Sequence, residues 1–366
     1  MPSASDRPDQ RRATVRRRRR LVAAFTIAVV VVFVGTALVV FAFPTSQRVV
    51  VVKVVKKAPP PTAHPSAIDH GQVSPGAASD AQVAQELKQT EVASTGGTET
   101  GSSSGSVGGA LDAGAEASFS QLNRTLPERV QIAVLPLSSR SVQILGGSTP
   151  AHGWSTTKVP VLAALLRARG SRGLTSSEDA SARAAITASD NQSILNLFVD
   201  LKQIKGGLVG ASAYIESLFR LSGDQQTIVA TAPPPSGAVT TFGQTEWSPA
   251  ASVKFMSALG RGCLVSSAKS SYILGLMQNI EASESWGLGS AGFRSVAFKG
   301  GWGPERSGNY LVRQVGIINV GSPTAAALAI VTLPSGSFAT GTETLTRAAS
   351  WLRSHVRPKP GANTSC

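Results

Sequence analysis

Three short motifs contain residue types that could carry out acyl transfer, and the first of them is Ser155-x-x-Lys158. It directly precedes a predicted helix that begins near Val159. Pro160 fits the first turn of such a helix, because its missing N–H leaves no hydrogen bond unmade there. Free N–H groups and the helix dipole favour negative charge at this end. A serine hydroxyl beside a desolvated amine is an activated nucleophile here, although the motif alone is equally an N-cap serine with a solvated lysine.

The second motif is Ser189-Asp190-Asn191, between two predicted helices over 178–187 and 192–201. A serine in such a turn can relay a proton to a leaving group, and an asparagine can hydrogen-bond a substrate amide. Taken alone, the stretch is more simply an N-cap cluster for the helix that follows.

The third motif, Lys299-Gly300-Gly301, is predicted to end the strand over 295–299. Glycines at a strand end let a ligand approach the backbone closely, and the lysine offers a cation for a carboxylate. In isolation the same residues are typical of a glycine hairpin turn.

The elements around the motifs predict one α+β domain. The order of patterns is a helix, two strands, a block of helices, three strands and a last helix, which favours a five-stranded antiparallel sheet flanked by helices, with an all-α insertion. The predicted helices are 113–123, 159–166, 178–187, 192–201, 214–221, 252–259, 271–280 and 343–355, and the predicted strands are 130–137, 142–145, 295–299, 311–319 and 325–333.

Residues 21–43 form an uncharged, mainly apolar run of 23 residues, long enough to cross a bilayer core of about 30 Å. Eight arginines precede the run and four basic residues follow it, which predicts a cytoplasmic tail over 1–20 and an extracytoplasmic remainder. A cleaved signal peptide is the alternative, but its apolar core is usually only about 7–15 residues long. We therefore expect a single-pass protein of the cell membrane.

Most of the basic charge lies in the same N-terminal segment. Residues 1–57 account for +10 of the formal charge of +14, so the remaining 309 residues carry only +4. This distribution argues against nucleic acid as a partner. Residues 44–111 are predicted to be a Pro/Gly/Ser-rich linker, and residues 112–366 the folded domain.

Cys263 and Cys366 match no metal-ligand spacing, and the histidines form no ligand pattern, so we expect no metal and no cofactor. In an extracytoplasmic domain the two cysteines either form a disulfide or remain one buried and one terminal thiol.

Together and in this order, the three motifs resemble the S-x-x-K, S-D-N and K-T-G signature of class A β-lactamases and penicillin-binding proteins. The resemblance covers about residues 112–357. It includes the helices around the second motif, and Leu218–Asp224 and Thr240-Thr241, which look like the flanks of the family's omega loop. It implies the α+β fold of that family.

The resemblance implies catalytic roles for three residues. Ser155 would be the acylated nucleophile, and Lys158 its general base or electrostatic activator. Ser189 would relay protons, while Asp190 would organise the turn without taking part in the chemistry.

The substrate-binding residues implied by the resemblance come from two motifs. Asn191 would hold the substrate amide, and Lys299, with Gly301, would bind the substrate at its carboxylate. The oxyanion hole would use the backbone N–H groups of Ser155 and Trp302.

Three departures from the family pattern bear on turnover. Residues 225–239, in the place of the omega loop, contain no Asp or Glu, and Glu246 is out of register. Class A enzymes use an omega-loop glutamate to activate the deacylating water, so β-lactam deacylation should be poor here. Gly300 replaces the middle Thr of K-T-G, which removes a hydroxyl that helps to bind the carboxylate. Ser155 and Ser189 are only 34 positions apart, which suggests a trimmed helical domain.

Other polar and aromatic residues near the motifs have plainer interpretations. His152 is a loop histidine, because Lys158 already fills the place of the base. Arg306 and Arg313 either face a substrate carboxylate or form surface salt bridges, and Trp302 either lines the cleft or packs. Of the remaining tryptophans, those expected to pack are Trp154, Trp247, Trp286 and Trp351.

The sequence therefore predicts a membrane-anchored, extracytoplasmic serine acyl-transferase or hydrolase. Its substrate would be a β-lactam or a peptidoglycan-type stem peptide with a carboxylate. The alternatives are a functional class A-like β-lactamase with another deacylation route, and a catalytically silent peptidoglycan- or ligand-binding module on the same fold.

Overall fold

A five-stranded antiparallel sheet is the centre of the part of the chain that this computed structural model describes, residues 109–305 and 308–366. The strands are β1 (Val130–Pro136), β2 (Gln143–Leu145), β3 (Val296–Pro304), β4 (Tyr310–Ile318) and β5 (Ala326–Thr332). Their order across the sheet is β2-β1-β5-β4-β3, with every neighbouring pair antiparallel. Every residue of β1 and β5 is buried, because helices cover both faces of the sheet.

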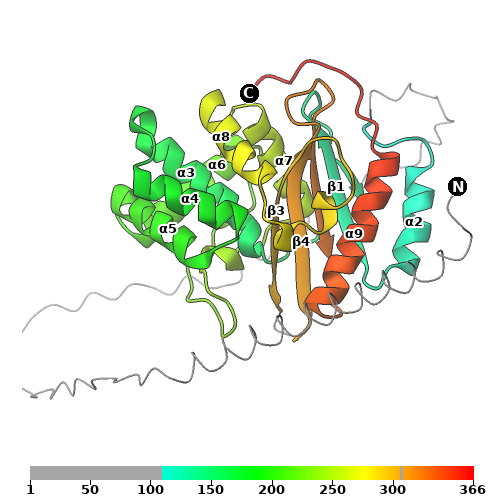
Figure 1. The fold of residues 1–366 in the computed structure, drawn as a ribbon, viewed down its shortest axis with the longest axis horizontal. Coiled ribbons are helices and arrows are strands. Elements are labelled where there is room, and N and C mark those ends of the chain that lie inside the picture. The colour runs from blue at the N-terminus through cyan, green and yellow to red at the C-terminus, as the bar shows by residue number, and fades with distance from the viewer. Residues whose placement is uncertain (1–108, 306–307) are drawn as a thin grey trace, which may run out of the picture. The chain divides into compact units, whose positions relative to one another are not determined.

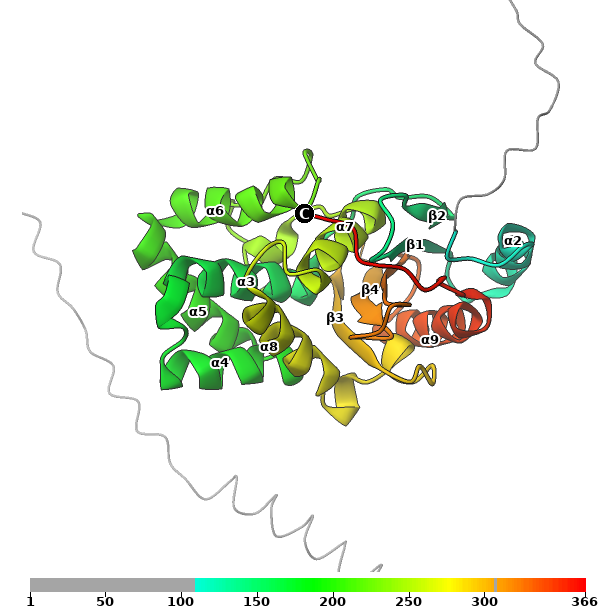
Figure 2. The same ribbon diagram turned by 90° about the horizontal axis from the view of Figure 1, so that it is seen from above.

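Helices from the two ends of the domain pack together on one face of the sheet (Figure 1). These are α2 (Ala115–Thr125) and α9 (Phe338–His355). On the other face, α7 (Pro249–Gly260) lies against β1, β4 and β5, and α8 (Ser267–Gln278) lies against β3 (Figure 2). Two apolar clusters result, one on each side of the sheet.

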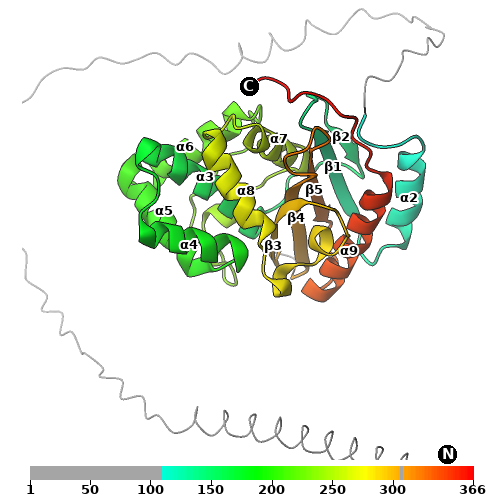
Figure 3. The same cartoon turned by 45° about the horizontal axis from the view of Figure 1, so that its top comes forward.

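The remaining helices form a layer beyond α7 and α8, away from α2 and α9 (Figure 3). They are α3 (Lys158–Arg169), α4 (Ser176–Thr187), α5 (Asn191–Lys205) and α6 (Leu208–Leu221). Helix α3 is buried from its first residue through Leu166, because α4, α5, α6 and α8 all pack against it. The short 3-10 turns among the described residues are Trp154–Thr157, Gly170–Arg172, Phe242–Gln244, Ala282–Glu284 and Gly287–Gly289.

The predicted α+β class, sheet and helical insertion are confirmed, but the extent of β3 was predicted wrongly. The strand does not end at Lys299; it continues through both glycines to Pro304, paired with β4 over its whole length. Glycine has low strand propensity, which is why the sequence pattern stopped there. The ladder with β4 outweighs that propensity.

The described chain begins slightly before the predicted domain. Ala110 and Leu111 were both predicted to belong to the linker. In the structure Ala110 is fully buried, and Leu111 forms an isolated β-bridge with Val356. Among residues 109–305 and 308–366, no helix is long and apolar enough to cross a membrane. The predicted tail over 1–20 and anchor over 21–43 lie outside the described residues.

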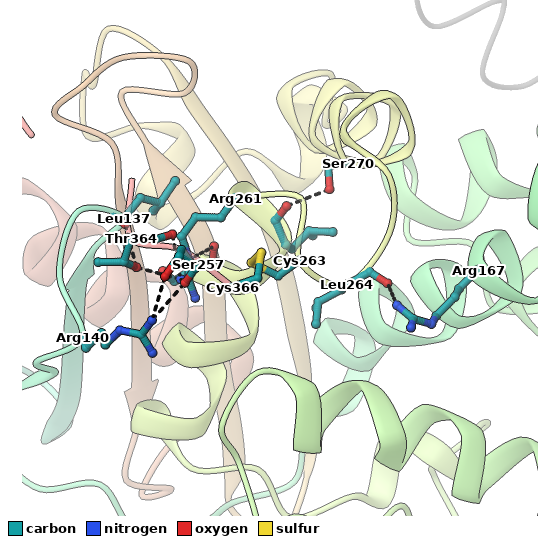
Figure 4. Close-up of a disulfide and its surroundings, with 12 residues drawn as sticks. Leu137, Arg140, Arg167, Ser257, Arg261, Cys263, Leu264, Ser270, Thr364 and Cys366 are labelled. Atoms are coloured by element: carbon teal, nitrogen blue, oxygen red, sulfur yellow. Dashed lines mark hydrogen bonds between the residues drawn. A yellow bond between two sulfur atoms is a disulfide. The ribbon is translucent and has the colours of Figure 1, made fainter. Parts of the chain in front are cut away.

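A disulfide joins Cys263, just after α7, to the C-terminal residue Cys366 (Figure 4). This is one of the two alternatives that the sequence left open. Arg261 holds the same tail by donating from Nη1 to Thr364 Oγ1 at 2.7 Å. The N–H of Thr364 in turn donates to the carbonyl of Leu137 at 3.1 Å. The C-terminus is therefore fixed across the top of the sheet and α7.

Removing the disulfide should destabilise the domain. The bond closes a chain segment with a sequence separation of 103 residues, which restricts the unfolded chain. We expect the double variant Cys263→Ser/Cys366→Ser to lose about 2–4 kcal/mol of unfolding free energy in urea titrations. The wild type in reductant should unfold at the same urea concentration as the variant. Equal midpoints for the variant and the oxidised wild type would contradict the prediction.

Candidate active site

Ser155 lies on the 3-10 turn Trp154–Thr157, which runs directly into α3. Lys158 is the first residue of α3, and Pro160 is the third. Pro160 thus occupies the first turn, as the sequence predicts, where no intrahelical hydrogen bond is lost. The serine is placed at the N-terminal end of a helix that the rest of the helical layer surrounds.

Trp154, the residue before Ser155, has a left-handed backbone with φ of 46°, which is unusual for a bulky side chain. Its ring packs on Gly303 of β3, where a Cβ atom would come within 2.3 Å of it. Its Nε1 donates to Glu305 Oε1 at 3.3 Å, and Glu305 Oε2 lies 2.7 Å from His152 Nδ1. Such strain persists only where the surroundings enforce it. His152 belongs to this support for Trp154, in keeping with its interpretation as a loop histidine.

The Ser189-Asp190-Asn191 turn joins α4 to α5. Ser189 has a left-handed backbone with φ of 57°, and its side chain is buried. Asp190 is the N-cap of α5 and accepts a hydrogen bond from the N–H of Ser193 at 2.7 Å. Asp190 therefore organises the turn, as the sequence predicts. Asn191 opens α5 and is exposed.

Two lysine ammonium groups from different layers of the fold meet at Ser189. Lys158 Nζ, from α3, donates to Ser189 Oγ at 3.3 Å and also to the carbonyl of Ser189. Lys299 Nζ, from β3, donates to Ser189 Oγ at 2.8 Å and to the carbonyl of Gly300 at 3.0 Å. Lys158 is 1% exposed and Lys299 is fully buried. Because both nitrogens approach one oxygen, they are no more than about 6 Å apart.

Burial controls the charge of both lysines. It lowers the pKa of Lys158 to about 7, and the charge on Lys299 acts in the same direction, while Glu284 and Asp190 oppose them. Burial also lowers the pKa of Lys299 to about 8, and Glu284 opposes it. With a pKa near 7, Lys158 is partly neutral at neutral pH, so its amine can accept a proton.

A cavity of about 210 Å³ opens beside this cluster. Among its lining residues are Ser155 of the first motif, Ser189 and Asn191 of the second, and Trp302, which directly follows the third. The other described residues that line it are Trp154, Ala188, Gly237, Val239, Thr240, Glu284, Gly303, Pro304 and Tyr310. The structure therefore brings the predicted nucleophile, proton relay and amide-binding residue to one cavity, with the two lysines buried next to Ser189.

Gly301 of β3 lies against the backbone of the nucleophile turn. A Cβ atom there would come within 2.9 Å of the Ser155 nitrogen and 2.8 Å of the Thr156 nitrogen. Contacts this short with backbone atoms cannot be relieved by rotating a side chain. A glycine is required at this position for β3 to approach Ser155.

Gly300, which replaces the family's Thr, faces an aromatic cluster instead. A Cβ atom at Gly300 would come within 2.8 Å of the ring of Trp286. Trp286, Trp302 and Phe338 contact one another with ring centroids 5.1 to 6.1 Å apart. The missing hydroxyl thus coincides with space that Trp286 occupies, and Trp302 both packs in this cluster and lines the cavity.

Glu284, the last residue of the 3-10 turn Ala282–Glu284, is a lining residue that sequence reasoning missed. No other described residue that lines the cavity is acidic. Burial raises its pKa, and the charges of Lys299 and Lys158 oppose that shift. No local pattern marks it, because the turn between α8 and β3 approaches the motifs only in the folded chain. Segment 225–239 contributes residues to the cavity but no carboxylate, and Glu246 is exposed.

Arg313 does not have either of the roles that the sequence suggested. It is fully buried, and its guanidinium donates to the carbonyls of Ala151, His152 and Trp247 at 3.0 to 3.2 Å and to Ser252 Oγ at 2.9 Å. It is thus neither a surface ion-pair partner nor a residue of the cavity. It ties β4 to the segment before Ser155. Arg306 lies outside the described residues.

This arrangement brings together side-chain types that acyl transfer can use. Ser155 lies at a helix N-terminus and lines a cavity, and Lys158, whose pKa is near 7, begins the helix that follows. The hydroxyl of Ser189 accepts hydrogen bonds from both Lys158 and Lys299. Such a set can activate the serine hydroxyl and return a proton to a leaving group.

The fold resembles several solved structures, although no family model matches the sequence and no curated protein matches it. A variant of the TLA-1 extended-spectrum β-lactamase superposes with a TM-score of 0.52 at 17% identity, covering 65% of this chain and 96% of the neighbour. The chromosome-encoded β-lactamase of Vibrio parahaemolyticus gives 0.50 at 16% identity, covering 65% and 97%. The class A β-lactamase from Mycobacterium abscessus gives 0.50 at 18% identity, covering 66% and 98%. The chain therefore has a class A β-lactamase-like fold.

Placing a methyl group between β3 and the nucleophile turn should damage the site. We expect Gly301→Ala to push Ser155 away from the strand and to cost about 1–3 kcal/mol of stability, because backbone atoms fill the space. Thermal unfolding measures the loss. Gly275→Ala on α8 is the matched control, because nothing lies within 4 Å of a Cβ atom there and alanine favours a helix. Equal melting temperatures for Gly301→Ala and the wild type would contradict the prediction.

Proposed function

Because the described domain has a class A β-lactamase-like fold, we propose that it is a serine hydrolase or acyl-transferase that forms an acyl-enzyme on Ser155. The observation that carries the proposal is the meeting of Lys158 and Lys299 at the hydroxyl of Ser189, beside the cavity that Ser155 lines. The substrate class is a β-lactam or a peptidoglycan-type stem peptide that carries a carboxylate.

Acylation follows from the charges of the site. The neutral amine of Lys158 accepts the proton of Ser155 as the serine oxygen bonds to the substrate carbonyl carbon. The backbone N–H groups of Ser155 and Trp302 stabilise the resulting oxyanion. Ser189 then passes a proton from Lys158 to the departing nitrogen as the carbon–nitrogen bond breaks. The proton that leaves Ser155 thus ends on the leaving group, and Lys158 is neutral again.

Deacylation lacks the group that class A enzymes use for it. Segment 225–239 contains no carboxylate that could activate a water on that side of the cavity. The acyl-enzyme should therefore be long-lived, so acylation and transfer to an acceptor are favoured over rapid β-lactam hydrolysis.

The proposed location is the outer side of the cell membrane, with the chain held by the segment over 21–43 and the linker over 44–111. The charge asymmetry around that segment supports this orientation. A tethered domain near the cell wall would have access to stem peptides.

A second candidate function is a catalytically silent binding module for such peptides. The absent carboxylate in segment 225–239 and Gly300 in the third motif favour it. The hydrogen-bonded set of Lys158, Ser189 and Lys299 opposes it, because a binding module has no need for a buried lysine with a pKa near 7.

Intact mass after incubation with benzylpenicillin distinguishes these functions. We expect full-length protein to gain the mass of one penicilloyl group and to keep it, and Ser155→Ala to gain none. Ser354→Ala, which removes an exposed hydroxyl from α9, should behave as wild type. An unmodified wild type with the drug intact would support the binding module. An unmodified wild type with the drug consumed would indicate an efficient β-lactamase.

The pH dependence of acylation should follow the lysines. The rate constant should rise with pH through about 7, because Lys158 must lose its proton to act as a base. It should fall again above about 8, where Lys299 loses the charge that attracts a carboxylate. Rapid mixing with a chromogenic β-lactam measures both limbs. Lys158→Arg should acylate about 100-fold more slowly or worse, since an arginine cannot deprotonate. A rate that is highest at pH 5 would contradict this assignment.

A further inference from the structure

Glu284 occupies a place that neither the sequence motifs nor the proposed mechanism explains. Its side chain lines the same cavity as Ser155 and Ser189. Within the described part of the chain, its Oε2 is buried and has no hydrogen-bond partner. A buried carboxylate oxygen without a partner is costly, so its retention calls for a compensating interaction.

The backbone places Glu284 beside the Ser189 turn. The N–H of Glu281 donates to the carbonyl of Thr187, two residues before Ser189, at 3.0 Å, and the N–H of Glu284 donates to the carbonyl of Glu281 at 2.9 Å. On the other side of the turn, Gln314 Nε2 of β4 donates to the carbonyl of Trp286 at 2.7 Å. The segment that carries Glu284 is therefore attached both to the end of α4 and to the sheet.

Among residues 109–305 and 308–366, no carboxylate makes a hydrogen bond to either lysine. The hydrogen bonds of Lys158 and Lys299, as the described residues show them, go to Ser189 and Gly300. Two ammonium groups that share one hydroxyl oxygen repel each other, and burial makes that repulsion stronger. A carboxylate in the same low-dielectric surroundings offsets it through space.

The other charged groups near the lysines are less suited to this role. Asp190 is exposed, and its carboxylate accepts from the N–H of Ser193 at the start of α5. Glu281 is exposed, and its charge acts on Glu284. Tyr310 lines the cavity but carries no carboxylate. Glu284 is left as the half-buried acidic residue, with a buried Oε2, whose charge acts on both lysines.

We propose that Glu284 is a positioning residue whose carboxylate, in the cavity that Ser189 also lines, offsets the positive charge of the lysine pair and helps both lysines to hold their protons, so that Lys299 stays charged. The carboxylate then offsets part of the positive charge that the two lysines bring to Ser189. The role in catalysis rests on the proposed acylation of Ser155, but the effect on the charges of the lysines does not. Lys299 retains its positive charge for an anionic substrate, and the pH at which Lys158 becomes a neutral amine is set in part by Glu284.

The test is a pH titration of the lysine side-chain 13Cε signals in full-length protein labelled on lysine, with acylation by benzylpenicillin measured in parallel. Lys158→Arg and Lys299→Arg assign the two signals. In Glu284→Gln we expect both titration midpoints to move to lower pH by about one pH unit. The rising limb of acylation against pH should move with that of Lys158, and the affinity for the anionic drug should fall near pH 8.

Two further variants separate charge from structure. Glu284→Asp keeps the charge, so its midpoints should stay closer to wild type than those of Glu284→Gln. Glu281→Gln, from the same turn, removes an exposed carboxylate and should leave both midpoints unchanged.

Unchanged lysine midpoints in Glu284→Gln would overturn the proposal. Unchanged midpoints together with slower release of the adduct would overturn it in favour of a base for deacylation. Shifted midpoints in a protein whose wild type forms no adduct would support the charge role and refute acylation of Ser155. The two failures are therefore distinguishable.

Discussion

The candidate site depends on one interaction, the approach of two buried ammonium groups to the hydroxyl of Ser189. At a separation of no more than about 6 Å and an effective dielectric constant of about 20, two positive charges repel by about 3 kcal/mol. Burial adds a desolvation penalty for each charge. The cluster persists because the surrounding elements hold the three side chains in place and because one lysine loses its proton near neutral pH.

The elements that hold the cluster come from both layers of the fold. Lys158 and Ser189 belong to the helical layer, and Lys299 belongs to the edge strand β3. The layers can approach because β3 has glycines where it meets the nucleophile turn. Gly301 lies against the backbone at Ser155, and Gly303 accommodates the ring of Trp154. The left-handed backbone of Trp154 is the strained feature that this contact supports.

The sequence predicted those parts of the fold and site that have local signals. The helices, the sheet and the three motifs could be recognised because periodicity, capping residues and motif spacing are properties of neighbouring residues. The length of β3 could not, because its pairing with β4 outweighs the low strand propensity of its glycines. Glu284 and the burial of Arg313 depend on contacts between distant segments, and nothing near them in the chain indicates those contacts. The disulfide likewise depended on where the fold placed Cys366.

The position of Glu284 also bears on why acylation and deacylation should differ in this chain. A carboxylate on the segment over 225–239 would serve two purposes, since it would offset the lysine charges and could activate a water for deacylation. Here the carboxylate approaches the lysines from the connection between α8 and β3 instead. The electrostatic requirement of the lysine pair can be met from that direction, because charges act through space. Activation of a water cannot be transferred in the same way, since it requires the base within hydrogen-bonding distance of a water that is aligned with the acyl carbon. A carboxylate on this connection therefore offsets the lysine charges without supplying the base that an omega-loop carboxylate would provide for hydrolysis.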